Sequence, residues 1–403
     1  SPQVESGSND SVFTQRVLWL FNSIGTKTSL LYWGRILPRF MERFPDTEVC
    51  AAMPPSKPIP ETDKHVECVG AIHIPLGPRK NSYQRQYVVA SPFIIGRIRQ
   101  SNPDVVVVKE LVAFAMYLAL LRPLLGKTKI LALIEGNPYQ GRTRKPNALV
   151  LWLRKMACRR FDLIMTNNDG GKEYLMKSLG VPESKIYVRP FLVSDVSPPA
   201  AGDSLELPEG IVKPDNKVVF LYTGQLIPRK GVKQVVEAVS RLGTEERAQF
   251  ELWMVGDGKQ RDELDELIRD KQLESTVKLL GRQPYEKMSA FYCAADVFVM
   301  PTLDDYRALV GFEAISHGLP MMHSIHDGSN LEVVDAAVNG YTFDPQDADA
   351  TAERLRWFLA NQDQLPEMSA ASTRLSHDFT VEKAVEGLTH AIFRCLGYTT
   401  SSL

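Results

Sequence analysis

The segment VVFLYTGQLIPRKGVKQVVEAVSRL (residues 218–242) decides the fold of this chain. It opens with an apolar, β-branched run at 218–223, which predicts a strand buried on both faces, as in a parallel sheet covered by helices. Residues 232–242 repeat apolar side chains at helical spacing, and a short loop with a glycine at each end joins the two elements. A strand, a tight loop and a helix in this order are typical of a doubly wound α/β domain.

The same alternation of apolar strands and amphipathic helices continues in both directions from this segment. The predicted strands are 16–22, 48–53, 66–74, 104–108, 129–135, 162–167, 185–190, 218–223, 251–255, 277–280, 296–301 and 320–323. The predicted helices are 30–44, 86–100, 111–125, 146–160, 170–180, 232–242, 260–271, 285–294, 309–317, 348–359 and 381–395.

A chain of 403 residues accommodates two domains of about 200 residues each. The stretch before residue 217 is rich in Pro, Ser, Gly and acidic residues, which indicates a linker. We therefore expect two Rossmann-like α/β domains facing each other across a cleft, where open parallel sheets bind ligands. The predicted boundaries are a flexible tail at 1–14, a first domain at 15–195, a linker at 196–216, a second domain at 217–378 and a final helical segment at 379–403 that packs back on the first domain.

The charge is distributed unevenly along the chain. Residues 1–200 carry 27 Lys and Arg against 16 Asp and Glu, a net charge of +11, whereas the whole chain has a net charge of −1. This asymmetry favours an anionic partner or a membrane surface for the first half, although a solvated basic surface would have the same composition. The five cysteines have no metal-ligand spacing, which indicates free thiols in a reducing, cytoplasmic setting.

Two clusters of polar residues follow predicted strands of the second half. In the loop 224–231, Gly224 permits a sharp turn, and Arg229 and Lys230 add charge to the amide groups of the following helix start, which suits a phosphate group. Asp305 and Glu313 have seven residues between them, with a helix start in that interval, and a carboxylate there can chelate the hydroxyls of a ribose. Taken singly, each cluster is equally compatible with a solvated turn or an exposed helix.

Together with their neighbours, these clusters resemble glycosyltransferase family 4, whose members have the two-domain GT-B fold. The resemblance spans residues 16–395 and is strongest from 222 to 343. It is carried by YTGQLIPRKGV (222–232), LWMVGDG (252–258), LLGRQPYEKMSAFYCAADVFVMPTL (279–303), FEAISHGLPMM (312–322) and DGSNLEVVDAAVNGYTFDPQDADA (327–350).

The resemblance implies a retaining transfer of a sugar from a nucleotide-sugar donor, with UDP as the favoured nucleotide. It implies that the second domain binds the donor and the first domain binds the acceptor. It assigns Lys230 to the donor diphosphate, Glu313 to the ribose and Asp305 to the sugar or phosphate. The further implied donor contacts are Gly25, Gly224, the backbone amides of Leu309 and Val310, and a border around the nucleobase formed by Gly281, Arg282 and Gln283.

Three positions depart from the family pattern. Gln225 stands where an arginine is common, so that Arg229 or Arg307 would have to supply the cation, and Asp305 replaces a longer glutamate. Glu135 stands where many members have a histidine that faces the sugar. A carboxylate at this strand end could orient a hydroxyl or accept a proton. Alternatively, it could form a salt bridge with Arg142 or Arg144.

The acceptor side of the resemblance falls on a basic stretch that includes Arg142, Arg144 and Lys145, which favours an anionic, saccharide or lipid-linked acceptor at a membrane surface. Few aromatic residues interleave these charges, which argues against nucleic acid. We expect neither a cofactor nor a metal ion. The alternatives are a GT-B phosphorylase or epimerase, and a binding or scaffold protein that has lost catalysis.

Overall fold

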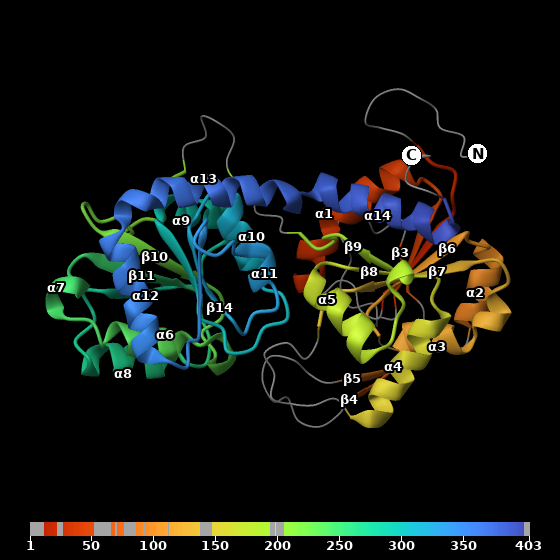
Figure 1. The fold of residues 1–403 in the computed structure, drawn as a ribbon, viewed down its shortest axis with the longest axis horizontal. Coiled ribbons are helices and arrows are strands. Elements are labelled where there is room, and N and C mark those ends of the chain that lie inside the picture. The colour runs from red at the N-terminus through yellow and green to blue at the C-terminus, as the bar shows by residue number, and fades with distance from the viewer. Residues whose placement is uncertain are drawn as a thin grey trace. The chain divides into compact units, whose positions relative to one another are not determined.

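The computed structural model of the chain forms two compact α/β units (Figure 1). It describes residues 12–21, 27–51, 66–68, 71–75, 86–91, 93–111, 113–137, 147–193, 198 and 205–398. Among these, the first unit contains the residues up to Val193 and those from Thr380 onward, and the second unit contains the residues between them. Each unit is described here by itself.

The first unit is built on a seven-stranded parallel sheet. Its central strands are apolar throughout because helices cover both faces. The final helix, α14 (Val381–Leu396), packs against α1 (Lys27–Arg43), and Phe393 lies with its ring centroid 4.8 Å from that of Phe13. In spatial order the strands are β3 (Val66–Cys68), β2 (Thr47–Ala51), β1 (Val17–Phe21), β6 (Val105–Lys109), β7 (Lys129–Ile134), β8 (Leu163–Thr166) and β9 (Ile186–Val188). The other α-helices of this unit are α2 (Ile94–Ser101), α3 (Ala113–Leu120), α4 (Ala148–Arg160) and α5 (Asp169–Glu173).

The second unit contains a six-stranded parallel sheet. From β10 the strands are added on one side as far as β12, and from β13 onward they are added on the other side of β10, which is the arrangement of a doubly wound fold. In spatial order the strands are β12 (Val277–Gly281), β11 (Phe250–Val255), β10 (Val218–Thr223), β13 (Val297–Met300), β14 (Met321–Ser324) and β15 (Gly340–Phe343). Its α-helices are α6 (Val232–Val239), α7 (Thr244–Arg247), α8 (Arg261–Asp270), α9 (Met288–Ala294), α10 (Leu309–Ser316), α11 (Asn330–Val333), α12 (Ala348–Ala360) and α13 (Leu365–Ser376).

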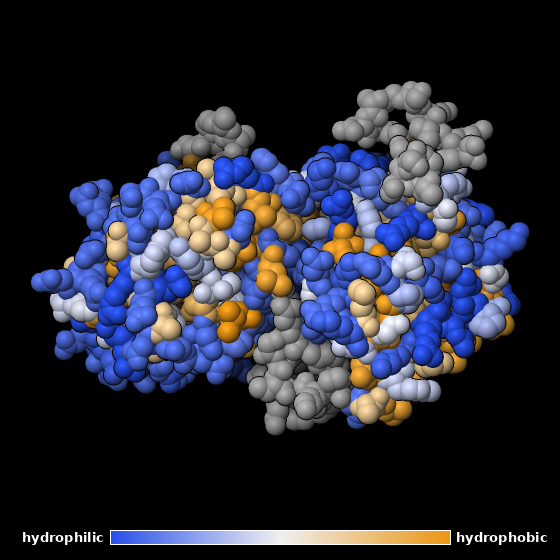
Figure 2. Space-filling model, viewed as in Figure 1, coloured by the Kyte–Doolittle hydropathy of each residue, from blue (hydrophilic) through white to orange (hydrophobic). Residues whose placement is uncertain are grey.

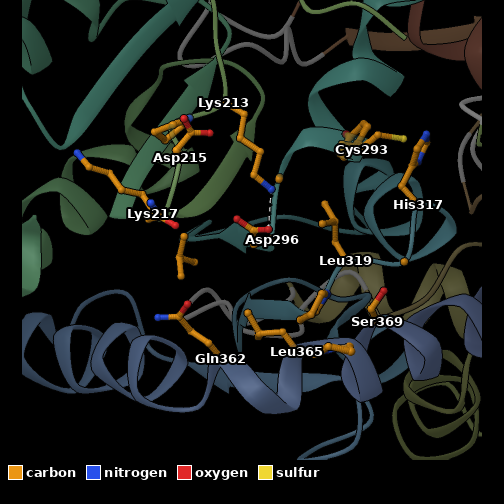
Figure 3. Close-up of a pocket in the computed structure, with 18 residues that line it drawn as sticks. Lys213, Asp215, Lys217, Cys293, Asp296, His317, Leu319, Gln362, Leu365 and Ser369 are labelled. Carbon is orange, nitrogen blue, oxygen red and sulfur yellow. Dashed lines mark hydrogen bonds and ion pairs between the residues drawn. The ribbon is translucent and has the colours of Figure 1, made fainter. Parts of the chain in front are cut away.

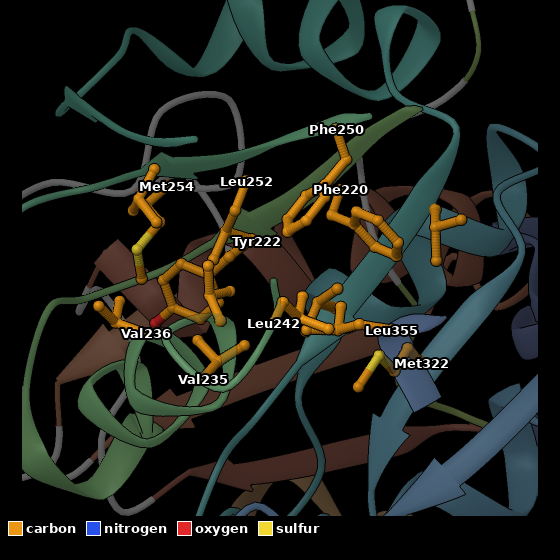
Figure 4. Close-up of a cluster of buried hydrophobic side chains, with 14 of the residues drawn as sticks. Phe220, Tyr222, Val235, Val236, Leu242, Phe250, Leu252, Met254, Met322 and Leu355 are labelled. Atoms are coloured by element: carbon orange, nitrogen blue, oxygen red, sulfur yellow. The ribbon is translucent and has the colours of Figure 1, made fainter. Parts of the chain in front are cut away.

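Strand β10, the first element of the segment 218–242, is buried on both faces. Phe220 and Tyr222 of β10 pack into one core cluster with Val235 of α6 (Figure 4), whereas Val219 and Leu221 enter the cluster on the opposite face. Successive side chains of a strand point to opposite faces, so an uninterrupted apolar run is what a sheet with two covered faces requires. This burial holds the carboxyl end of β10, and the loop after it, in a fixed place.

The predicted doubly wound α/β class and most of the predicted elements are confirmed, but residues 86–100 are not one helix. Residues Gln86–Ala90 form β5, which pairs antiparallel with β4 (Ala71–Pro75), and α2 begins only at Ile94. The run Tyr87-Val88-Val89 is β-branched and aromatic, and such residues prefer a strand. The predicted strand 66–74 is correspondingly two separate strands, β3 and β4. Strand β15 and helices α7, α11 and α13 were not predicted.

Candidate functional site

The glycine-bounded loop after β10 lies against the end of the neighbouring strand β13. Gly231 has a φ of +65°, and a Cβ at this residue would lie 1.8 Å from the carbonyl oxygen of Pro301. The backbone amide of Leu303 donates to the carbonyl of Arg229 at 2.8 Å. Only a glycine allows this approach and this backbone conformation. The loops that follow β10 and β13 are therefore joined at the carboxyl edge of the sheet.

These two loops bring two cations onto one carboxylate. Lys230 Nζ lies 2.5 Å from Asp305 Oδ2, and Arg229 Nη1 lies 3.0 Å from the same oxygen. All three side chains are largely buried, with exposed fractions of 13%, 9% and 13% for Lys230, Asp305 and Arg229. One carboxylate cannot neutralise two cations, so the cluster carries a net positive charge. A phosphate group could form charge-assisted hydrogen bonds with it.

The start of α10 and the predicted ribose-binding carboxylate lie on the next part of the chain. Ala308 precedes the helix and provides no side-chain cap, so the amides of Leu309 and Val310 are not capped by it. Glu313 is buried and accepts a hydrogen bond of 2.6 Å from the hydroxyl of Tyr292, which lies 2.9 Å from Thr223 Oγ1. Burial and the adjacent Glu313 carboxylate raise the pKa of Tyr292 well above its usual value, so its hydroxyl remains a donor.

Arg307, which the sequence predicted as a donor contact, is paired with a buried carboxylate in this structure. Its Nη2 lies 2.9 Å from Glu332 Oε1, and the two side chains are only 2% and 5% exposed. The guanidinium also stacks over the ring of Phe312, 4.0 Å from its centroid. Arg307 therefore holds the start of α10 against the segment that carries Glu332. Of the two arginines proposed to replace the missing cation, Arg229 is the one that lies in the charged cluster.

A third loop, after β14, joins the same edge. Asp327 is fully buried, and its Oδ1 accepts hydrogen bonds from the amide and the hydroxyl of Ser329 at 2.8 and 2.7 Å. The amide of Gly328 donates to the carbonyl of Asp305. Burial alone would raise the pKa of Asp327, but His323, at 3.3 Å, and the Ser329 hydrogen bonds outweigh it and hold this pKa well below its usual range. The contacts of Asp327 with His323 and Ser329 thus fix the loop after β14 from inside the unit.

The three residues predicted to border the nucleobase lie at the end of β12, beside β11. Gly281 has a φ of +68°, and its carbonyl accepts from the amide of Gly256 at 2.8 Å. Gln283 Nε2 donates to the carbonyl of Leu280 at 2.7 Å, and Arg282 is exposed. The backbone of these three residues thus lies at the same carboxyl edge of the sheet as the charged cluster.

In the first unit, Glu135 directly follows β7 at the carboxyl edge of that sheet. Its carboxylate pairs with Lys109 Nζ at 2.8 Å. Its amide donates to Glu110 Oε1 at 2.8 Å, and its carbonyl accepts from Asn167 Nδ2 at 2.9 Å. The candidate residues Gly25, Arg142, Arg144 and Lys145 lie outside the described residues.

A separate cavity of about 860 Å³ lies at the opposite, amino-terminal edge of the second sheet (Figure 3). Lys213 and Asp296, which precede β10 and β13, form an ion pair of 2.8 Å in its wall, and Leu365 and Ser369 of α13 lie across from them. Because this edge is remote from the loops after β10, β13 and β14, the cavity is distinct from the charged cluster.

A parallel sheet whose carboxyl-edge loops bring polar and charged side chains together defines the class of doubly wound α/β proteins, which bind ligands at this edge. Two family models match this chain, "Glycosyl transferases group 1" over residues 203–374 and "Glycosyltransferase Family 4" over residues 39–193. The chain belongs to these glycosyltransferases, of the family 4 type, and its fold is GT-B.

Individual relatives agree with this assignment. The chain is 30% identical to the lipopolysaccharide core biosynthesis glycosyltransferase LpsE of Rhizobium meliloti (strain 1021) over 37% of its own length and 41% of that protein. It is 29% identical to the amylovoran biosynthesis glycosyltransferase AmsK of Erwinia amylovora, over 43% and 44% of the two chains. The chain thus spans about half the length of the curated relatives it matches.

Solved structures show the same fold. A glycosyltransferase of Rickettsia africae superposes with a TM-score of 0.70 at 16% identity, over 96% of this chain and all of that one. Anabaena Alr3699/HepE in complex with UDP superposes with a TM-score of 0.67 at 15% identity, with the same coverage.

Several residues of the site were not found from the sequence: Tyr292, Glu332 and Asp327 in the second unit, and Lys109 and Glu110 in the first. Tyr292, Glu332, Lys109 and Glu110 act through partners distant in the chain, which no local spacing marks, whereas Asp327 is bound by its near neighbours His323 and Ser329. Lys109 and Glu110 directly follow the predicted strand 104–108, and this position was a signal that could have found them. Among the described residues, no group of His, Cys, Asp and Glu has the geometry of a metal site, and no helix is long and apolar enough to cross a membrane.

Proposed function

We propose that this protein is a retaining glycosyltransferase that uses a nucleotide-sugar donor, with UDP as the favoured nucleotide. The observation that carries the proposal is the cluster of Arg229, Lys230 and Asp305 at the carboxyl edge of a parallel sheet, followed by the uncapped start of α10 and the buried Glu313. Cations and amides in this arrangement stabilise the charge that develops on a departing diphosphate.

In the proposed reaction, Lys230 and Arg229 bind the diphosphate, Glu313 binds the ribose and Asp305 lies beside the sugar. Within the first unit, Glu135 orients the sugar or the acceptor hydroxyl. No side chain is assigned as a covalent nucleophile, so we propose displacement on one face of the sugar, with the donor phosphate helping to deprotonate the acceptor. A metal ion is not needed for these steps, because protein cations and helix amides meet the leaving-group charge.

Donor binding is the first test. Saturating UDP should raise the unfolding temperature of the protein in the presence of EDTA, because a ligand at about 100 times its dissociation constant stabilises the folded state by about 2.7 kcal/mol. GDP, UDP-glucose and added Mg²⁺ are the comparisons. Stabilisation by free phosphate together with a sugar would favour a phosphorylase, and conversion of the donor sugar without an acceptor would favour an epimerase. If no nucleotide stabilised the protein, the binding or scaffold alternative would replace the proposal.

We further propose that the acceptor is lipid-linked and anionic or lies at a membrane surface. Helix α4 supports this proposal, because Leu149, Trp152 and Leu153 are 63%, 56% and 40% exposed and the helix ends in exposed Arg159 and Arg160. Figure 2 shows apolar surface where Figure 1 places α4. A helix with exposed apolar and basic side chains suits the interface of an anionic bilayer.

Vesicle binding tests this surface. The protein should sediment with vesicles that contain phosphatidylglycerol more than with phosphatidylcholine alone, and added salt should weaken this binding. Replacement of Leu149, Trp152 and Leu153 by serine should reduce the bound fraction severalfold, whereas Phe93→Ser, an 83% exposed position on α2's amino-terminal side, should not. Equal binding by all three proteins would exclude α4 as the docking surface.

A further inference from the structure

Glu110 occupies an unusual position at the carboxyl edge of the first sheet. It directly follows β6 and has a φ of +59°, a left-handed conformation that is unfavourable for a residue with a side chain. Its own amide donates to the carbonyl of Leu133 in the neighbouring strand β7 at 2.8 Å. Backbone strain of this kind persists where surrounding contacts fix it, and it is often found at functional sites.

The strained backbone lets the Glu110 side chain reach across to the residue after β7. Glu110 Oε1 accepts the amide of Glu135 at 2.8 Å, while Lys109, the preceding residue, binds the Glu135 carboxylate at 2.8 Å. Two consecutive residues at the end of β6 thus hold Glu135: Glu110 holds its backbone, and Lys109 holds its side chain. The third contact, from Asn167 after β8 to the Glu135 carbonyl at 2.9 Å, completes the support.

We propose that Glu110 is a positioning residue that fixes the backbone of Glu135 and, through its own charge, makes the orientation of the Glu135 carboxylate depend on pH. This inference rests on the proposed role of Glu135 in sugar transfer. Glu110 does not need to touch the substrate, because it acts through the Glu135 amide and through the electrostatic interaction between the two residues.

Among the described residues, the charged groups that act on Glu110 are Glu135 after β7, Lys109 on β6 and Arg154 on α4. Burial, reinforced by the negative charge of Glu135, raises the pKa of Glu110 to about 7, although the Glu135 amide, Lys109 and Arg154 act in the opposite direction. Burial would lower the pKa of Lys109, but its ion pair with Glu135 outweighs this and raises it, so Lys109 remains charged. Glu110 therefore gains its negative charge near neutral pH, beside Lys109, which is already charged.

The linkage between proton binding and folding gives a test that needs no substrate. Glu110 keeps its proton in the folded protein up to about pH 7, whereas in the unfolded chain it loses it near 4.5. The stability that this proton confers is present below about pH 4.5 and is lost as the pH rises toward 7. Wild type should therefore lose stability relative to Glu110→Gln across this interval, in unfolding curves measured at each pH.

The matched control is Glu183→Gln, an exposed glutamate of the same unit whose pKa the ion pair with Lys172 lowers, so that it does not titrate in this interval. Its stability difference from wild type should stay constant between pH 5 and 7. If Glu110→Gln also ran parallel to wild type over this interval, the proposal would be overturned.

A kinetic readout separates positioning from a purely structural role. In wild type, the rate of UDP release from UDP-glucose should change with pH around an apparent pKa near 7. This pH dependence should flatten in Glu110→Gln, which keeps the hydrogen-bond acceptor but cannot titrate. Glu110→Ala, which also loses the acceptor, should be slowed at least about tenfold at every pH. A pH–rate profile of Glu110→Gln with the shape of the wild-type profile would reduce Glu110 to a structural residue and overturn the proposal.

Failure of the donor proposal would be visible separately, as absence of both UDP binding and UDP release in wild type. In that case hydrogen exchange at the Glu135 amide decides the inference. The amide should exchange faster in Glu110→Ala than in wild type, because its acceptor is lost, and unchanged protection would overturn the positioning role.

Discussion

Lys230→Ala should lower the rate of sugar transfer by a factor of about 10² to 10³, the loss typical of removing one electrostatic contact to a charge that develops in the transition state. Lys230 Nζ and Arg229 Nη1 share a single oxygen of Asp305, so a diphosphate that enters this cluster meets a cation that the carboxylate only partly neutralises. Without Lys230, Asp305 retains Arg229 as its partner and the cluster has no excess positive charge. Donor affinity should therefore fall together with the rate.

The matched control is Lys233→Ala on α6, three residues further along the chain. Lys233 is 37% exposed and pairs with Glu263 at 2.8 Å, so its loss changes the same amount of charge close to the loop but outside the cluster. Release of UDP from a UDP-sugar and calorimetric titration with UDP measure the two effects. Near-normal turnover in Lys230→Ala, or an equal loss in Lys233→Ala, would contradict the assignment of the diphosphate site.

The stability of the Lys230 variant completes this test. Asp305 keeps its salt bridge to Arg229 at 3.0 Å, and its Oδ1 still accepts a hydrogen bond of 3.0 Å from the amide of Tyr306. The carboxylate is thus not left unpaired when Lys230 is removed. We expect the unfolding temperature of Lys230→Ala to stay close to that of wild type, so that a loss of turnover reports on the reaction and not on folding.

The sequence was sufficient for those parts of the fold and site that depend on local patterns. The apolar run of β10 and the glycines of the following loop predicted a buried strand and a sharp turn, and the structure shows both. The resemblance to family 4 also implied that Asp305 lies near the sugar or phosphate of the donor. The ion pair between Lys230 and Asp305 joins residues 75 positions apart, because β10 and β13 are adjacent in the sheet.

What the sequence could not provide is the choice of partner among several residues of the same charge. Arg307 was predicted as a donor contact, and for Glu135 a role at the sugar and a salt bridge with Arg142 or Arg144 were both open; the structure pairs Arg307 with Glu332 and Glu135 with Lys109. Burial decides between such candidates, because a charge removed from water must be matched by the nearest opposite charge on an adjacent element. That adjacency follows from the strand order, which sequence periodicity does not determine.

The error at residues 86–100 has a related cause. Apolar residues in this stretch are compatible with one face of a helix, yet Gln86–Ala90 pair with β4 in a two-stranded sheet. The antiparallel partner lies a short distance earlier in the chain, and its pairing overrides the local helical spacing. Tertiary contacts of this kind also account for β15, whose short Gly340–Phe343 segment is defined by its pairing with β14.

The other large effect concerns the stability of the second unit. Glu332→Ala should destabilise this unit by about 3–5 kcal/mol, because Arg307 is then left as a buried charge without its carboxylate. Arg307 Nε also lies 2.9 Å from Glu332 Oε2, so the pair is held by two contacts. The guanidinium sits over Phe312 of α10, and disorder there should loosen the helix start and weaken UDP binding as well.

The double variant Arg307→Met with Glu332→Leu distinguishes two causes of lower stability in Glu332→Ala, the loss of packing and the unpaired charge of Arg307. Replacement of a buried ion pair by apolar side chains of similar volume is often neutral or stabilising, so the double variant should recover most of the unfolding temperature that Glu332→Ala loses. Glu263→Ala, which breaks the exposed pair with Lys233, should change stability little. Thermal unfolding of the three variants and wild type gives the comparison. If Glu332→Ala were as stable as Glu263→Ala, the buried pair would not be what holds the start of α10.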